Sequence, residues 1–331
     1  MNIFQIISEI EKVDPEVYDR LDSRRSIFKH MSGMGKTLAG AAVPLAFGAV
    51  LNKAYAQTSM APSVNDVLNF ALKLEYLEAD FYNRGLGAMG ATATAAQTAF
   101  RAGFSATNLA ALDRIRNDEM AHVAFLRTAL GTNAIAAPPA NTFDFTGAKG
   151  GTTPGPFATV FTAPAVFLAV SQALEDTGVR AYKGGAPYLA SNKDVLTAAL
   201  NIHSVEARHA SRIRTMRRAG AMNNAASQTA AAGTDRSASP KSWISGTDGG
   251  GPAPAQTAPV YAMGAAPAYT PAVITFPAED NVTQGGVNLL TALASLNFPA
   301  VAFSEAFDEA LPVPVVSDIA RTFVVTGSTF I

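Results

Sequence analysis

The sequence contains no cysteine, and this absence excludes several kinds of chemistry. Without thiols the chain has no disulfide, no iron–sulfur cluster, no thiolate metal site and no cysteine nucleophile. Any metal ion must therefore be held by oxygen and imidazole ligands. Histidine is also scarce, with four residues in 331, so each histidine that stands in a pattern with acidic residues is informative.

Charge is the second property that the chain has little of. Charged residues make up 15% of the sequence, and the formal net charge is −1 with a pI near 6.4. This balance gives no electrostatic basis for binding a phosphate backbone or an anionic membrane surface, so we expect no nucleic-acid partner. Hydrophobic residues make up 48%, which is enough to bury a substantial core.

Residues 1–56 are similar to an export signal with an N-terminal leader. Residues 23–29 (SRRSIFK) resemble the twin-arginine signature, an uncharged Ala-rich run follows at 37–51, and AYA at 54–56 is a small-x-small cleavage pattern. A basic loop before a buried helix and an uncleaved membrane anchor are the alternatives, although the run is shorter than the ~20 residues of a membrane span. We expect cleavage near Gln57, export to the periplasm or cell envelope, and no membrane association afterwards.

Four segments of the remaining chain have the apolar periodicity of helices. Ser63 with Asp66 predicts a helix start, and Gly131 and Gly220 predict helix ends. The expected helices cover 63–86, 105–131, a third segment beginning near Ala163 and Pro164, and 193–219. A Pro- and Gly-rich connection between the second and third is far longer than a hairpin needs. Residues 57–221 are therefore expected to form a four-helix bundle with a long crossover.

The second and fourth predicted helices each carry a Glu-x-x-His motif. These are Glu119 with His122 and Glu206 with His209. A spacing of three places both side chains on one helical face, about 5–6 Å apart at Cβ, so one motif can hold one metal ion. A single copy is a weak signal, because Glu and His are ordinary on exposed helices. Two copies on separate helices, using two of the three histidines that follow Gln57, are a stronger one.

The first and third predicted helices share a different motif, a glutamate followed seven residues later by a tyrosine. The pairs are Glu75 with Tyr82 and Glu175 with Tyr182. Seven residues are two helical turns, so each pair lies on one face. Tyr82 and Tyr182 are candidate catalytic residues with a redox or hydrogen-bonding role, or else packed core aromatics whose hydroxyls are satisfied.

The order Glu, Glu-x-x-His, Glu, Glu-x-x-His is the ligand set of ferritin-like two-metal carboxylate proteins. Residues 70–82 (FALKLEYLEADFY), 117–126 (NDEMAHVAFL) and 203–214 (HSVEARHASRIR) resemble the exported ferritin-like domain proteins related to plant desiccation-associated proteins. The tail motifs SWI at 242–244 and AFDE at 306–309 extend the resemblance. It implies an all-α, ferritin-like four-helix bundle with a loop-rich C-terminal extension. It also implies six metal ligands: Glu75, Glu119, His122, Glu175, Glu206 and His209.

Several neighbouring side chains are alternatives to this ligand set. Glu78 lies within one turn of Glu75 and is its rival. Asp118, Asp176 and Glu78 are candidates for a hydrogen bond to the free imidazole N–H of a ligating histidine, or are solvated. His203 lies one turn before Glu206 and reads as a polar neighbour, with a seventh ligand as the alternative. A bundle that no longer binds metal is a further alternative, which the presence of all six ligands disfavours.

Residues 222–331 are expected to wrap around the bundle. They are rich in Pro, Gly and Ala up to about residue 285, with short helices expected at 285–296 and 299–311 and an extended segment at 322–325. Trp243 and the run 273–276 offer apolar anchors for docking. The acidic residues of the second short helix are read as a solvated face; they are Glu305, Asp308 and Glu309.

The chemistry of the six ligands favours a redox metal pair. Four carboxylates neutralise two divalent ions, and hard oxygen with borderline nitrogen suits iron or manganese without excluding zinc. One glutamate of each Glu-x-x-His motif is expected to bridge two ions roughly 3.5–4 Å apart. We therefore expect an exported oxidoreductase acting on peroxide or dioxygen, of ferroxidase or catalase-like type. A non-catalytic metal-binding or desiccation-protection protein of the envelope is the alternative, and a homo-oligomer is compatible with either.

Overall fold

The computed structural model describes residues 62–224, 239–265 and 275–331. The expected leader and its cleavage site lie outside the described residues. The described part is mainly helical, with only short strands, as the sequence led us to expect. Within these ranges, no helix combines the length and the apolar composition that crossing a membrane requires.

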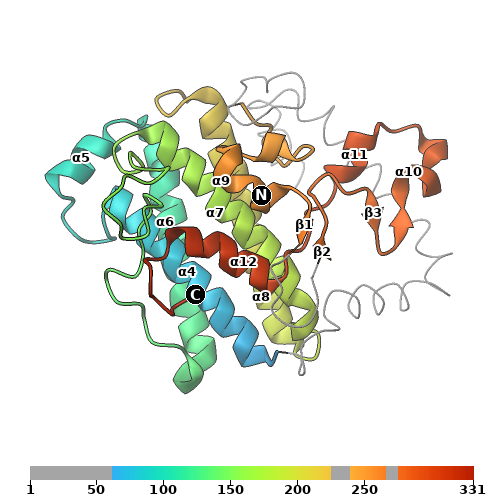
Figure 1. Ribbon diagram of the computed structural model, residues 1–331, viewed down its shortest axis with the longest axis horizontal. Helices are drawn as coiled ribbons and strands as arrows, with labels where there is room; N and C mark the ends of the chain where they lie inside the picture. Colours follow the sequence, from blue (N-terminus) through green and yellow to red (C-terminus); the bar gives the residue numbers. More distant parts are fainter. Residues whose placement is uncertain (1–61, 225–238, 266–274) are drawn as a thin grey trace, which may run out of the picture.

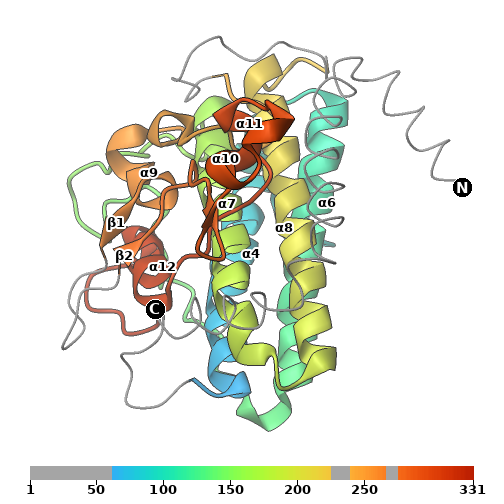
Figure 2. The same ribbon diagram turned by 90° about the vertical axis from the view of Figure 1, so that its right-hand side faces the viewer.

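Four long helices run alongside one another (Figure 1, Figure 2). They are α4 (Val64–Leu86), α6 (Ala106–Leu130), α7 (Pro164–Gly185) and α8 (Lys193–Ala219). Local sequence explains their ends. Ser63 caps α4 in a reciprocal capping box with Asp66, Ser105 caps α6, and a glycine follows α4, α6 and α8.

The apolar faces of these helices meet in the core. α4 packs along α6, and α7 packs along α8. Phe81 of α4 and Phe167 of α7 are fully buried, and their stacked rings have centroids 4.6 Å apart. Leu112 of α6 and Ile213 of α8 are also completely buried. The four helices therefore enclose one interior, into which the acidic side chains described below project.

The connections add elements that periodicity did not predict. A short helix α5 (Ala95–Arg101) precedes α6, and a capping box of Thr94 with Gln97 starts it. Between α6 and α7 the chain is mostly irregular, yet three of its aromatic residues are buried in the core. These are Phe143, Phe145 and Phe157. Phe143 also forms a β-bridge with Val324 near the C-terminus, so this connection is packed between the helices and the tail.

The C-terminal region packs against one side of the four helices, mainly on α7 (Figure 2). Its helices are α9 (Pro254–Tyr261), α10 (Leu289–Ala292), α11 (Ala300–Ser304) and α12 (Val313–Ala320). Its strands form two antiparallel pairs: β1 (Gly264–Ala265) with β2 (Thr275–Phe276), and β3 (Thr283–Gln284) with β4 (Val287–Asn288). The C-terminal Ile331 belongs to the same core cluster as Phe81.

Three expectations for this region are corrected by the structure. The helix expected at 299–311 ends at Ser304. The chain that follows contacts α7, whose Lys183 and Arg180 donate hydrogen bonds to the carbonyl groups of Asp308 and Glu309. The helices α9 and α12 stand where loop and connection were expected. Glu305 and Glu309 are buried and not solvated, since they accept hydrogen bonds from Ser245 and Gln284, each at 2.5 Å.

Candidate metal centre

The four long helices bring all six candidate ligands together in their common interior. The glutamates are completely buried at 0% exposure, and His122 and His209 are 8% and 5% exposed. The glutamates are Glu75, Glu119, Glu175 and Glu206. α4 and α7 contribute one glutamate each, and α6 and α8 contribute one Glu-x-x-His pair each. None of the six lies on an outer surface.

The donor atoms of these residues form two overlapping groups of four. In each group the four atoms lie within 4.8 Å of one another. The first group is Glu75, Glu119, His122 and Glu206; the second is Glu119, Glu175, Glu206 and His209. Glu119 and Glu206 thus belong to both groups, while each terminal glutamate and each histidine belongs to one. This is the arrangement expected of two neighbouring ions bridged by one glutamate from each Glu-x-x-His motif.

The imidazole of His122 faces three carboxylates with a single atom. Its Nδ1 lies 3.1 Å from Glu75 Oε2, 3.1 Å from Glu119 Oε2 and 3.1 Å from Glu206 Oε1. One nitrogen carries at most one hydrogen and cannot direct it to three acceptors at once. A cation at the centre of these atoms would satisfy all of them, so the convergence fits a metal ion better than a hydrogen-bond network.

His209 faces the second group in the same manner. Its Nδ1 lies 2.8 Å from Glu119 Oε1 and 3.2 Å from Glu175 Oε2. Its other nitrogen, Nε2, lies 3.4 Å from Asp118 Oδ2, and the same oxygen accepts a hydrogen bond from Arg114 at 2.9 Å. A carboxylate on the outer nitrogen of a ligating histidine fixes its tautomer and raises its basicity. Of the three residues proposed for this role, Asp118 is in place.

Three carboxylate oxygens in the centre have no hydrogen-bond donor. They are Glu119 Oε1 and both oxygens of Glu206. The histidine nitrogens approach Glu119 Oε1 and Glu206 Oε1 at ion-pair distance without the direction of a hydrogen bond. Leaving a buried carboxylate oxygen unpaired costs several kcal/mol or forces it to take up a proton. The residues present therefore fit a pair of cations, and the unpaired oxygens belong to the two glutamates shared between the groups.

Each tyrosine of the Glu-x6-Tyr motifs donates a hydrogen bond to the glutamate of the other helix. Tyr82 of α4 donates its hydroxyl hydrogen to Glu175 Oε1 of α7, and Tyr182 of α7 donates to Glu75 Oε1 at 2.5 Å. Burial, reinforced by the acidic neighbours, raises the pKa of both phenols well above the ordinary value, so both stay protonated. The spacing of seven places each Glu and Tyr of a motif on one helical face, but the hydroxyl reaches the glutamate of the other helix.

Burial and mutual repulsion change the protonation of the centre when no cation is bound. Burial, followed by the charge of Glu175, raises the pKa of Glu119 to about 7, and burial raises that of Glu206 well above its usual range. Burial lowers the pKa of His209, but Glu175 and Glu119 outweigh it and raise this pKa to about 12. Burial also lowers the pKa of His122, but its contacts with Glu119, Glu206 and Glu75 outweigh burial and raise this pKa. The metal-free centre therefore holds protons where it would hold metal.

Glu78 is a fifth buried carboxylate beside the ligands. It is 3% exposed, and burial, followed by the charges of Glu206 and Glu119, raises its pKa well above the usual range. Gly178 of α7 leaves room mainly for Glu206, since a Cβ there would lie 3.2 Å from Glu206 Oε2, while Glu78 Oε1 would be at an ordinary contact distance of 3.5 Å. Glu78 joins neither four-atom group, which supports the choice of Glu75 as the ligand.

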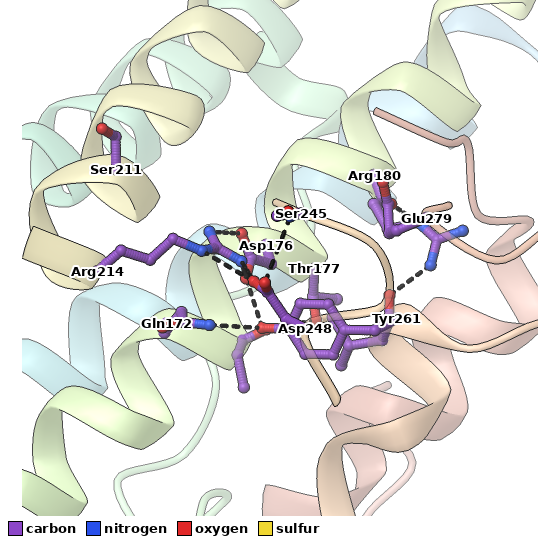
Figure 3. Close-up of polar contacts among 12 residues, drawn as sticks. Gln172, Asp176, Thr177, Arg180, Ser211, Arg214, Ser245, Asp248, Tyr261 and Glu279 are labelled. Atoms are coloured by element: carbon purple, nitrogen blue, oxygen red, sulfur yellow. Dashed lines mark hydrogen bonds and ion pairs between the residues drawn. The ribbon is translucent and has the colours of Figure 1, made fainter. Parts of the chain in front are cut away.

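The other weighed residues lie elsewhere. His203 is half-buried on α8 and joins neither group. Asp176 lies among Arg214, Tyr261 and Asp248 (Figure 3). It forms two hydrogen bonds of 2.6 Å with Arg214 of α8 and accepts one from Tyr261 of α9. Periodicity gave no sign of this partner, because Tyr261 follows Asp176 by 85 residues.

A second polar network joins α7 and α8 to the C-terminal region, described at residues 239–265 and 275–331 and called the tail here (Figure 3). Arg214 also contacts Asp248 at 3.0 Å, and Arg180 contacts Glu279 at 2.6 Å. All four side chains are at most 1% exposed. Sequence analysis missed this network. The one available signal was an arginine within each apolar stripe, at 180 and 214, which cannot be buried without a partner.

Comparison with known families agrees with this geometry. Residues 63–219 match the family model described as ferritin-like domain. The matched range begins at the N-cap of α4 and ends at the last residue of α8, so it covers all four ligand-bearing helices. A search of curated proteins found no match. Residues 63–219 are therefore similar to a ferritin-like domain, and their helices carry buried acidic and histidine groups able to hold metal.

Proposed function

We propose that α4, α6, α7 and α8 form a ferritin-like four-helix bundle that binds two iron or manganese ions, with residues 131–163 as the crossover. The observation that carries this proposal is the membership of Glu119 and Glu206 in both groups of donor atoms. Two shared carboxylates between two sets of terminal ligands are what a two-metal site requires, whereas a single ion or a surface acidic cluster would need neither.

The ligands divide naturally between the two ions. Glu75 and His122 would hold one ion, Glu175 and His209 the other, and Glu119 and Glu206 would bridge them. The four carboxylates supply a charge of −4, which neutralises two divalent cations. Oxygen donors with one imidazole per ion suit iron and manganese. The same residues serve both metals, so the choice between them depends on loading in the host.

An iron or manganese pair, when bound, supplies two-electron exchange with peroxide or dioxygen. The residues of this chain orient and protect it. The hydroxyl groups of Tyr82 and Tyr182 hold one oxygen of each terminal glutamate, which fixes the direction of the other. Glu78, with its raised pKa, can hold a proton beside Glu206 and Glu119. The activity we propose is therefore an oxidoreductase of ferroxidase or catalase-like type.

We also propose that the protein is exported. Residues 23–29 and 54–56 favour a twin-arginine-type signal and cleavage to an envelope or periplasmic protein. This route is understood to carry folded proteins, and a ligand set drawn from four helices exists only after folding. Loading of the metals before export would therefore suit both features.

Elemental analysis of protein purified from its native host tests the metal proposal directly. We expect about two transition-metal ions per chain, from the two ligand groups, and consumption of peroxide or dioxygen that His122→Ala and Glu206→Ala abolish. Two ions without turnover on any of these oxidants would favour the non-catalytic metal-binding or desiccation-protection protein. A chain purified without metal, and unable to take up iron or manganese, would contradict both.

A further inference from the structure

A cavity of about 410 Å³ lies between α4 and α7, with α8 and the start of α12 at its sides. Its size is within the range of small-molecule pockets, roughly 300–1,000 Å³. Several of the residues that border it are small: Ala71 of α4, Ala181 and Gly185 of α7, and Ala199 of α8. Larger side chains at these positions would close the seam between the helices.

The cavity lies in register with the metal ligands. Leu68, Tyr182 and Ala199 border it, and each is seven residues from a ligand of its own helix: Glu75, Glu175 and Glu206. Seven residues are two helical turns, or about 10 Å along a helix. The cavity therefore lies about two turns from the ligand layer, toward the end of the helices where α4 begins.

Tyr182 connects the cavity to the centre. Its ring borders the cavity, and its hydroxyl donates to Glu75 Oε1 at 2.5 Å. Anything that packs against this ring touches a side chain hydrogen-bonded to a proposed metal ligand. The polar side chains at the cavity, among them Asp66 and Lys73, are at least partly exposed, whereas the deep residues Leu68, Ala71 and Leu189 are apolar and buried.

We infer that this cavity binds a small, mainly apolar organic molecule and that Tyr182 couples its occupancy to the metal centre. The inference rests on the proposed metal function for the coupling, but not for the binding. An apolar floor with a polar rim favours a molecule that buries a hydrocarbon or aromatic part and leaves a polar end toward solvent.

Binding of a phenolic probe, 4-methylphenol, tests the cavity. Its dissociation constant can be measured by ligand-observed NMR titration of the full chain, with and without metal. We expect saturable binding to both forms. Ala181→Leu fills the cavity and should weaken binding at least tenfold. Ala165→Leu makes the same change at an exposed position on the same helix and should leave binding unchanged.

A second cavity-filling variant distinguishes loss of the cavity from misfolding of the protein. Val313 borders the cavity from α12 but is 41% exposed, so Val313→Trp narrows the cavity without disturbing the core. It should also weaken binding tenfold or more. Unsaturable binding to the wild type, or filling variants that both bind the probe as tightly as the wild type does, would overturn the inference. Affinity that falls as protein concentration rises would show a second copy of the chain covering the cavity, which overturns it as well.

The coupling has a separate readout. In metal-loaded protein the probe should shift the optical or EPR spectrum of the metals. Tyr182→Phe should abolish this shift while changing the dissociation constant less than threefold, because the ring remains and only the hydroxyl is lost. Binding with an unshifted spectrum in the wild type refutes the coupling. Binding to a chain that takes up no metal refutes the metal proposal but leaves the cavity as a ligand site.

Discussion

Glu119 and Glu206 differ from Glu75 and Glu175 in their sequence context and in the groups of donor atoms to which they belong. Each stands three residues before a histidine on its helix, and each belongs to both groups of donor atoms. Their oxygens include the three buried oxygens at the centre that lack a hydrogen-bond donor. Loss of one shared carboxylate must therefore affect both ions, whereas loss of a terminal one affects mainly its own.

This difference predicts a graded loss of metal. Glu206→Gln keeps the shape of the side chain but removes a charge that both ions share, so we expect both ions to be lost. Glu175→Gln should remove one. His203→Gln changes a half-buried residue of α8 outside both groups and should keep both ions. Metal per chain after dialysis is the measurement, and two retained ions in Glu206→Gln would refute the bridging role.

The tyrosine hydroxyls make a second prediction at this scale. Tyr82→Phe removes the hydroxyl that donates to Glu175 Oε1 and leaves this buried acceptor without it. We expect the free energy of unfolding of the metal-free protein to fall by about 1–3 kcal/mol. Tyr76→Phe removes a hydroxyl whose partner, Arg127, is exposed, and should cost less than about 1 kcal/mol. Urea denaturation measures both, and equal losses would contradict the role of Tyr82.

At the scale of elements, α7 carries important side chains on two different sides. Its inner side carries Glu175 and Tyr182, and its outer side carries Asp176 and Arg180, which bind the tail. A backbone hydrogen bond also joins α7 to the tail, since the amide of Leu311 donates to the carbonyl of Arg180. A Cβ at Gly184 would lie 2.2 Å from the Leu311 carbonyl oxygen, so only glycine permits this contact. The tail therefore fixes the position of the helix that supplies a metal ligand.

Removing one tail charge should destabilise the protein. Asp248→Asn removes one of the two carboxylates beside buried Arg214, while Asp176 remains, so we expect a loss of about 1–3 kcal/mol. Asparagine tolerates the positive φ of 49° at this position, so backbone strain does not confound the result. Asp318→Asn breaks an exposed pair with Arg321 and should cost less than about 1 kcal/mol. Similar losses in both variants, measured by urea denaturation, would show that the buried network contributes little.

At the scale of the whole molecule, metal and protons compete for the same centre. The folded pKa of Glu119 is about 7, above the ordinary 4.5, so the metal-free folded state binds this proton more tightly than the unfolded state. Its contribution to stability is present below pH 4.5 and is lost as the pH rises to about 7. The raised pKa of His209 acts in the same direction at higher pH. Metal binding requires the deprotonated ligands and releases these protons.

We therefore expect opposite pH dependences for the two forms. From pH 5 to pH 8 the metal-free protein should lose up to about 3 kcal/mol of unfolding free energy from Glu119, at 1.36 kcal/mol per pKa unit. The metal-loaded protein should gain stability over the same range. Thermal unfolding of chelator-treated and loaded samples at both pH values makes the comparison. A metal-free protein that becomes more stable with rising pH would contradict the raised pKa of Glu119.

The sequence alone indicated the four long helices and the acidic and histidine residues that their interior brings together. Periodicity, the caps at Ser63 and Ser105 and the closing glycines placed the starts and ends of α4, α6 and α8 within about a residue, because these signals are local to the chain. The spacing of three in each Glu-x-x-His motif likewise fixed which side chains share a face. Local signals were sufficient wherever the relevant partner lay within a turn or two.

Only the tertiary structure decided which side chains meet across helices. The pairing of Tyr82 with Glu175, the burial of Glu78 beside the ligands, and the ion pairs of Arg180 and Arg214 join residues that lie far apart in the chain. The helices α9 and α12 also depend on contact with α7, since their short sequences have little helical propensity of their own. Such contacts depend on how the helices pack against each other, and no periodicity within one segment contains that information.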